Sequence, residues 1–212
     1  MPPIVPDIPE TPRRASYKDV LDAPTHKIAQ IVDGTLHLLP RPAFWHTRAS
    51  SRIGRRIGTP YEDGIGGPGG WVILNEPELH LGMRGEDILV PDLAGWRIEK
   101  FSEGEDVAFS GTRDVAYHTT APDWICEVLS PSTSDLDRGK KRDIYAREGV
   151  SWLWLIDPGT PALEAFVLQV GEWTPIATLI GDAKVSVPPF DEISFPLSDL
   201  CSRRPDRTSW RP

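Results

Sequence analysis

The chain has 212 residues and a formal net charge of −8, from 31 Asp and Glu against 23 Lys and Arg. That length and an apolar content of 39% suit one folded domain with a sizeable core, and two cysteines exclude a disulfide or Cys-rich zinc framework. No run approaches the ~20 apolar residues that cross a bilayer, so we expect a soluble, cytoplasmic protein without membrane contact. Taken alone, the acidic balance argues against a general nucleic-acid binder.

The first part of the chain predicts a leader, a short helix, a hairpin and a basic helix. Repeated prolines predict a disordered leader over residues 1–15. Ser16–Leu21 is typical of a short helix, and Lys27–Leu39 of a hairpin that turns at the Asp-Gly pair 33–34 in a type I′ turn. The next helix is expected over Arg48–Ile57, with the threonine before it as the N-cap.

Beyond residue 60 the pattern predicts strands with one helix among them. Trp124–Leu129 is nearly all apolar, as in a central strand covered on both faces. A helix is expected over Ser132–Glu148, with a capping box at residues 134–137. The order predicts one α/β (α+β) domain over residues 16–200, with a central mixed β-sheet flanked by helices and a hairpin towards each end. The other expected segments are strands at Trp71–Leu81, Ile88–Trp96 and Ser151–Asp157, a hairpin of Ala162–Val170 with Trp173–Leu179, and a flexible tail over 201–212.

Two carboxylates stand in strand patterns that place them among apolar side chains. Alternation puts Asp92 on the apolar face of its strand and Glu127 on the face of Ile125 and Leu129. Burying a carboxylate is costly unless a cation or hydrogen-bond donors compensate it. Either each acid accepts hydrogen bonds from loop backbone at a strand end, or the two form an oxygen-rich site for Mg²⁺ or Mn²⁺. Their occurrence together favours the metal site.

Two adjacent lysines follow on the predicted helix. Lys141 forms an i, i+4, i+8 stripe with Asp137 and Tyr145. That helix face should pack on the sheet and bring Lys141 towards Glu127. Lys140 points about 100° away around the helix, so we expect it in solvent.

Three segments together resemble the Uma-two family of endonucleases, part of the PD-(D/E)XK restriction-endonuclease-like superfamily. They are PDLAGWR at 91–97, ICEVLSPST at 125–133 and DRGKKRDIYAREGVSWLWLIDP at 137–158. The resemblance extends over roughly residues 16–200. It implies the superfamily core of a helix, a three-stranded meander, a helix and a further strand.

The resemblance also implies an Mg²⁺-dependent endonuclease that hydrolyses DNA phosphodiester bonds, with Mn²⁺ as an alternative metal. Asp92 would be the PD aspartate and Glu127 the second acid, and both would bind the metal together with the main-chain carbonyl of Val128. The superfamily places its lysine two residues after the second acid, where this chain has Leu129. The helix would supply the cation instead, as Lys141.

Three further residues are candidates for the same site. Glu76 or Glu78 could add a third carboxylate, and their shared strand parity leaves the choice open. His46 either approaches the phosphate or packs at the start of the basic helix.

The spread of charge revises the first impression of an acidic, non-binding protein. Basic residues gather on the two predicted helices that would flank the site, as a local footprint for a phosphate backbone. Superfamily analogy adds a possible homodimer. Two alternatives stay open: an inactive or weakly active nucleic-acid-binding accessory protein on the same fold, and a hydrolase of RNA or small phosphate esters. The candidate nucleic-acid contacts are Arg48, Arg52, Arg55, Arg56 and Lys140.

Overall fold

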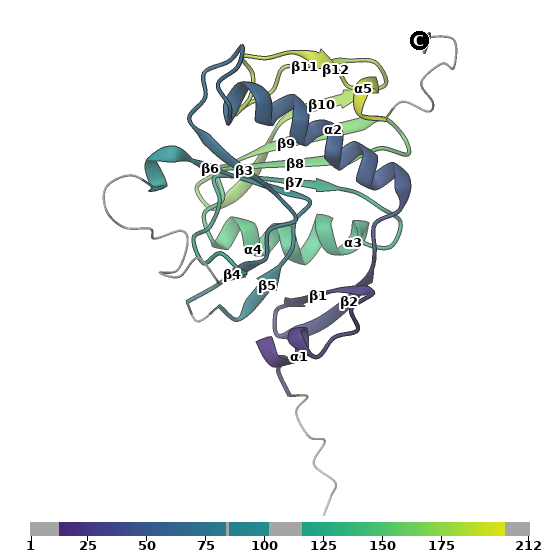
Figure 1. Cartoon of the computed structure of the whole chain (residues 1–212), viewed down its shortest axis with the longest axis vertical. Coiled ribbons are helices and arrows are strands. Elements are labelled where there is room, and N and C mark those ends of the chain that lie inside the picture. Colours follow the sequence, from purple (N-terminus) through teal and green to yellow (C-terminus); the bar gives the residue numbers. More distant parts are fainter. Residues whose placement is uncertain (1–12, 84, 102–115, 202–212) are drawn as a thin grey trace, which may run out of the picture.

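The computed structural model describes residues 13–83, 85–101 and 116–201 (Figure 1). The predicted leader up to residue 12 and the predicted tail from residue 202 lie outside the described residues. Ala15 does not belong to a leader, because its amide donates to the carbonyl of Gly34 at 2.8 Å. Cys201 does not begin a tail either: it ends helix α5 (Ser198–Cys201) and is buried.

A six-stranded mixed sheet forms the centre of the protein, in the order β10-β9-β8-β7-β6-β3. β7 and β8 run parallel, and the other neighbouring pairs are antiparallel. The predicted central strand is β7, and it is buried along its whole length. The strands are β3 (Trp71–Asn75), β6 (Leu93–Arg97), β7 (Trp124–Val128), β8 (Trp152–Asp157), β9 (Ala162–Gln169) and β10 (Glu172–Ile180).

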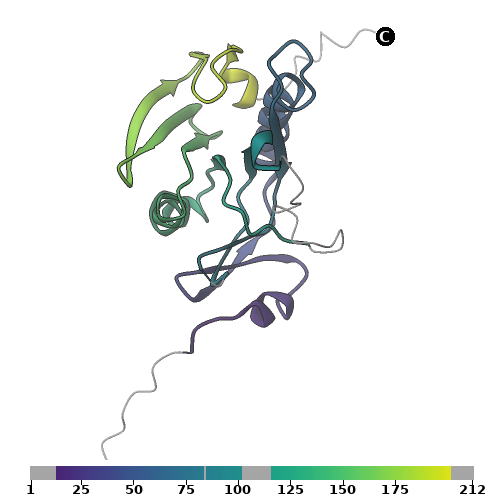
Figure 2. The ribbon, with the colours of Figure 1, turned by 90° about the vertical axis from the view of Figure 1, so that its left-hand side faces the viewer.

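Helices cover both faces of this sheet, as the side view in Figure 2 shows. α2 (Phe44–Tyr61) packs Ile53 into the apolar cluster on one face, together with the Trp and Cys side chains of β7. α4 (Arg142–Arg147) belongs to the cluster on the other face, which contains Ile125. Glu127 has the strand parity of Ile125 and therefore points towards α4.

A smaller sheet, ordered β2-β1-β5-β4, adjoins the large one (Figure 1). Its first two strands form the predicted hairpin, and left-handed backbone at Asp33 and Gly34 gives the type I′ turn. None of the described helices is long and apolar enough to span a membrane. The remaining elements are α1 (Tyr17–Leu21), β1 (Lys27–Val32), β2 (Thr35–Pro40), β4 (Leu79–Leu81), β5 (Asp87–Leu89), the 3₁₀ turn Ile98–Phe101, β11 (Lys184–Val185) and β12 (Phe195–Pro196).

Two segments predicted as single strands each divide between the two sheets. The run 71–81 leaves the large sheet after β3 and enters the small sheet at β4, with Glu76 in left-handed backbone before Pro77. The run 88–96 divides between β5 and β6 around Pro91. Proline has no amide hydrogen to donate to a strand ladder, so each proline marks the break. Asp92 consequently lies in the break and not within a strand, which corrects the predicted alternation.

The predicted bounds of the two longer helices also need correction. α2 begins at Phe44 rather than Arg48, and Thr47 lies inside the helix, where its amide donates to the carbonyl of Ala43 at 3.0 Å. The predicted helix 132–148 is interrupted. A short helix α3 (Ser134–Leu136) leads into a wide turn η2 (Asp137–Lys141), with non-helical backbone at Gly139, and then into α4. The expected capping box is absent because Thr133 is the N-cap and no side chain caps this helix.

Candidate active site

A cavity of about 310 Å³ opens where the two sheets diverge. The structure brings Asp92, Glu127 and Lys141 together in the lining of this cavity. The hairpin β1–β2 covers one side, where Gln30 lines the cavity. The carboxamide of Gln30 is buried and accepts a hydrogen bond from the amide of Val90 at 2.9 Å, which ties the hairpin to the chain just before Asp92.

Asp92 is held by the end of β7. Because Leu93 pairs with Cys126 across the sheet, Asp92 stands opposite the residues that close β7. Its Oδ2 accepts the amide hydrogen of Val128 at 2.7 Å, and its Oδ1 lies 3.3 Å from Nε2 of His46. Asp92 therefore accepts the backbone hydrogen bond expected for an acid at a strand end. Its other carboxylate oxygen lies beside His46, on the side of the cavity.

Glu127 is held by side chains from the segment that follows β7. Its Oε1 lies 2.7 Å from Nζ of Lys141 and accepts a hydrogen bond from the hydroxyl of Tyr145 at 2.7 Å. Nζ of Lys141 also lies 2.8 Å from Oδ1 of Asp137. The predicted stripe of residues 137, 141 and 145 therefore converges on Glu127, even though the helix carrying it is irregular.

The cluster contains more buried carboxyl groups than ammonium groups. Asp92, Glu127 and Asp137 are at most 9% exposed, and Lys141 at 2% is the ammonium among them. Burial raises the pKa of Glu127 to about 8, against the lowering effect of Lys141, and Asp137 and Asp92 raise it further. Burial alone would lower the pKa of Lys141, but the charges of Asp137 and Glu127 more than offset this and raise it above its ordinary value. Lys141 is therefore held as a charged donor.

His46 shares the field of the acids. Burial disfavours its protonated form, but the hydrogen bond and charge of Asp92, with the Val128 carbonyl and the charge of Glu127, raise its pKa above the ordinary value. Of the two alternatives for His46, the structure brings its ring to the acid pair as well as to the first turn of α2.

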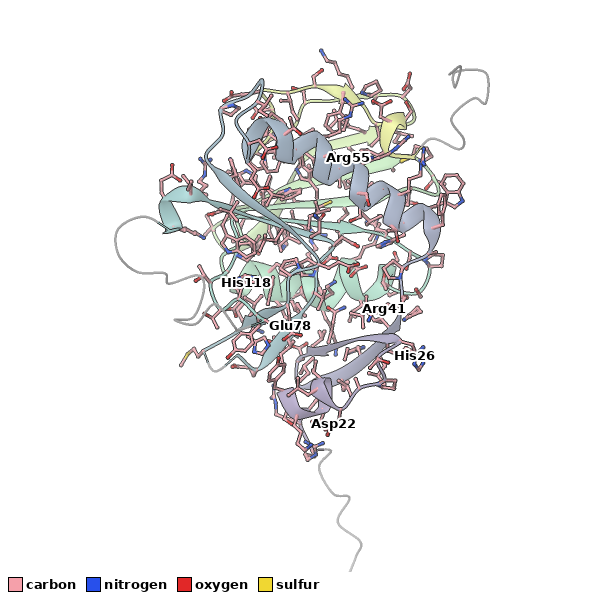
Figure 3. The ribbon with its side chains drawn as sticks, in the orientation of Figure 1. Asp22, His26, Arg41, Arg55, Glu78 and His118 are labelled. Carbon is pink, nitrogen blue, oxygen red and sulfur yellow. The ribbon has the colours of Figure 1, made fainter. Side chains whose placement is uncertain are left out.

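The two glutamates that the sequence left unresolved lie in different surroundings. Glu76 lines the cavity, and its amide donates to the carbonyl of Asp92 at 3.0 Å. Glu78 lies away from the cavity, with its carboxylate 2.8 Å from Nε2 of His80 and its carbonyl accepting the amide of His118. Figure 3 shows Glu78 beside His118, near the small sheet. Glu76 and Glu78 do not share the predicted strand, because both lie in the connection between β3 and β4.

The predicted cationic contacts are dispersed. Arg52 and Arg56 bond to Asp199 of α5, on the side of α2 away from the acid cluster. Arg55 is exposed (Figure 3) and lines a second hollow along α2 that shares His46 and Glu76 with the central cavity.

Arg48 is half-buried on α2, and its Nε has no hydrogen-bond partner among the described residues. Lys140 is exposed near Asp33, as expected. The structure brings neither of these two side chains into the cavity.

Sequence reasoning did not assign roles to several residues at the cavity. Asp137 and Tyr145 were visible as stripe partners of Lys141, so the signal was present. No sequence pattern indicated Gln30 or Arg41, because both reach the site through the pairing of the small sheet and the connection that follows it. Arg41 lines the cavity and donates to the carbonyl of Thr25 at 2.9 Å. No group of three or more His, Cys, Asp or Glu side chains in the described ranges has the arrangement of a metal centre.

Residues 15–198 match the sequence model of the Uma2 family, which is described as "Putative restriction endonuclease". The chain belongs to the Uma2 family. The resemblance read from the three sequence segments is therefore confirmed, and so is the nuclease class at the level of the family.

A solved structure supports the same fold. It is the crystal structure of a protein described as a putative nuclease belonging to DUF820, from Anabaena variabilis ATCC 29413. The two chains are 22% identical, superpose with a TM-score of 0.68, and match over 88% of this chain and 97% of the other. No curated protein matches the chain. The mixed α+β architecture predicted for a restriction-endonuclease-like core is thus confirmed.

Proposed function

We propose that this Uma2 protein is an Mg²⁺-dependent endonuclease that hydrolyses phosphodiester bonds in DNA. One observation carries the proposal: the ammonium of Lys141 lies 2.7 Å from Glu127, although the lysine belongs to the segment after the strand. An acid pair and a cation thereby share one cavity without a lysine at position 129. Family membership supports the nuclease reaction, and the metal and the residue roles are our inference.

The donor set suits Mg²⁺. Proteins hold Mg²⁺ through one or two carboxylates and leave its remaining positions to water and substrate phosphate. Asp92, Glu127 and the main-chain carbonyl of Val128 would hold it, and Mn²⁺ accepts the same ligands. The buried carboxyl groups outnumber the ammonium groups, so a divalent cation would find oxygen ligands there with little opposing positive charge. When bound, the metal lowers the pKa of a water molecule and neutralises charge on the scissile phosphate.

Lys141 would act as a hydrogen-bond donor and not as a base, since its carboxylate neighbours hold it charged. Its ammonium would orient the attacking water or stabilise the negative charge of the transition state. Asp137 would fix the position of Lys141, and Tyr145 that of Glu127. His46 would orient Oδ1 of Asp92, the oxygen that does not accept the Val128 amide.

The test is cleavage of plasmid DNA with Mg²⁺ or Mn²⁺ by the wild type and three variants, Asp92→Asn, Glu127→Gln and Lys141→Ala. We expect each variant to lose activity, while Lys18→Ala, which alters an exposed lysine on α1, keeps it. Equal cleavage by the wild type and the three variants would refute the site.

Metal titration separates the nuclease from the accessory-protein alternative. We expect wild-type protein to bind Mn²⁺ and Asp92→Asn to lose that binding, as measured by calorimetry. DNA binding that is independent of metal and unaccompanied by cleavage would support an accessory protein on the same fold.

A further inference from the structure

Two exposed aromatic side chains stand together at the start of α2. Phe44 is 68% exposed and Trp45 is 45% exposed, with ring centroids 5.0 Å apart in an edge-to-face contact. Among the described residues, Phe44 and Trp45 are the aromatic side chains classed as exposed. The other described Trp, Tyr and Phe side chains are buried or half-buried. Nearly half of the Trp45 side chain is open to solvent, and this surface is available to a ligand.

Trp45 borders a cavity of about 440 Å³, which we call the Trp45 cavity. The loop after β7, with Ser130 and Pro131, forms another wall, and the turn Asp157–Thr160 after β8 forms a third. This volume lies within the range of about 300–1,000 Å³ typical of small-molecule sites.

The Trp45 cavity adjoins the candidate active site. The two cavities share Ala43, His46, Ser130 and Pro131 as wall residues. His46 therefore borders the Trp45 cavity on one side, while its Nε2 lies 3.3 Å from Asp92 on the other. A group in the Trp45 cavity would belong to a nucleotide next to a phosphate at the acid pair.

The wall chemistry suits a neutral flat ring and not a phosphate. Neither lysine nor arginine occurs among the described residues that line the Trp45 cavity. Its one carboxylate, Asp157, already accepts hydrogen bonds from the amide of Gly159 and the hydroxyl of Thr160. The charge of Asp157 would repel a phosphate, but it would not repel the uncharged edge of a nucleobase. An indole on the rim supplies a stacking surface.

We propose that the Trp45 cavity binds an unpaired nucleobase of the DNA strand being cut, stacked on Trp45. The inference rests on the proposed nuclease function and names its substrate class. A base can enter the cavity only when it is outside a duplex stack, so single-stranded or frayed DNA is the preferred substrate. Stacking on an aromatic side chain tolerates every base, so this site selects unpaired DNA without selecting a sequence.

The experiment compares two fluorescent strands of equal length and charge, an oligothymidylate and an abasic deoxyribose-phosphate strand. Affinity is measured by anisotropy in EDTA at low salt, where the metal-dependent reaction does not run. We expect the wild type to bind the thymidine strand more tightly than the abasic strand. Trp45→Ala should weaken thymidine binding by about 5- to 150-fold, the range of one stacked base, and leave abasic binding unchanged.

Two control variants sharpen the comparison. Trp45→Phe keeps a ring and should retain most of the preference, whereas Leu21→Ala removes an exposed apolar side chain at the end of α1, which lines neither cavity, and should change nothing. An equal loss on both strands in Trp45→Ala, or a wild type without preference, overturns the base site.

The assay separates failure of this inference from failure of the proposed function. Plasmid cleavage that depends on Asp92, combined with equal affinity for the two strands, overturns the base site alone. Absence of cleavage and of binding to either strand overturns both.

Discussion

Replacing Lys141 by Met tests whether the buried ammonium holds the acid cluster together. Nζ lies 2.7 Å from Glu127 and 2.8 Å from Asp137, and these three side chains are at most 4% exposed. Removing one partner of a buried ion pair costs about 3–5 kcal/mol, whereas the change of volume from Lys to Met costs less than about 1.5 kcal/mol. We therefore expect Lys141→Met to lower the free energy of unfolding by about 3–5 kcal/mol in metal-free buffer.

The loss of stability in Lys141→Met should also depend on pH, and the ionisation of Glu127 determines whether that loss grows or shrinks as pH rises. Its folded pKa of about 8 lies above the unfolded value of about 4.3, so its contribution to stability is complete at low pH and is lost as pH rises through 8. Lys141 lowers the folded pKa of Glu127, so the substitution raises it further. The variant should keep losing stability above pH 8, where the contribution of Glu127 in the wild type levels off.

Urea denaturation followed by tryptophan fluorescence, in EDTA at pH 6 and pH 9, measures both effects. Lys140→Met is the matched control, because its side chain is 55% exposed and such surface changes stay within about 0.5 kcal/mol. A loss of less than about 1 kcal/mol in Lys141→Met, or a loss that shrinks with rising pH, would refute this account of the cluster.

Three further predictions concern the stability of the fold. Tyr145→Phe removes the buried hydroxyl that bonds Glu127 and should lower the free energy of unfolding by about 1.5–3 kcal/mol, measured by urea denaturation. Asp87→Ala removes a buried carboxylate that accepts the amide of Asp33 and pairs with Arg147, and should lower the free energy of unfolding by about 1–3 kcal/mol and expose the β1–β2 hairpin to faster amide exchange. Saturating Mg²⁺, at about 100 times its Kd, should stabilise the wild type by about 2.7 kcal/mol and Asp92→Asn by much less, measured by thermal unfolding; equal shifts would contradict metal binding at Asp92.

The elements around β7 could be predicted because their signals are local. A run of apolar residues with one acid describes a strand buried on both faces, and parity alone then fixes the side on which Glu127 lies. Spacing of i, i+4 and i+8 brings Lys141 and Tyr145 to the same face. Both signals survive the irregular helix, since the wide turn lies between residues that still contact one another.

The surroundings of Asp92 could not be predicted in the same way. Residues 88–96 read as one apolar strand, and only the presence of two sheets explains why the chain changes partners at Pro91. Gln30 reaches the cavity through the pairing of β1 with β5, a contact between segments far apart in the sequence. Likewise, a helical pattern shows that α2 carries arginines but not that Arg52 and Arg56 face α5.

Stability does not explain why two buried carboxylates contact one ammonium beside a third buried carboxylate, Asp92. Well-packed apolar residues in place of a buried ionic group are often neutral or stabilising by about 1–4 kcal/mol. The strand break at Pro91 and the wide turn at Gly139 have the common effect of bringing Asp92 and Lys141 to the end of β7. Both irregularities interrupt regular backbone hydrogen bonding, and both lie at the cavity. A fold shaped for stability alone would not concentrate these costs at one point, so the arrangement supports the proposed role of this cavity as an active site.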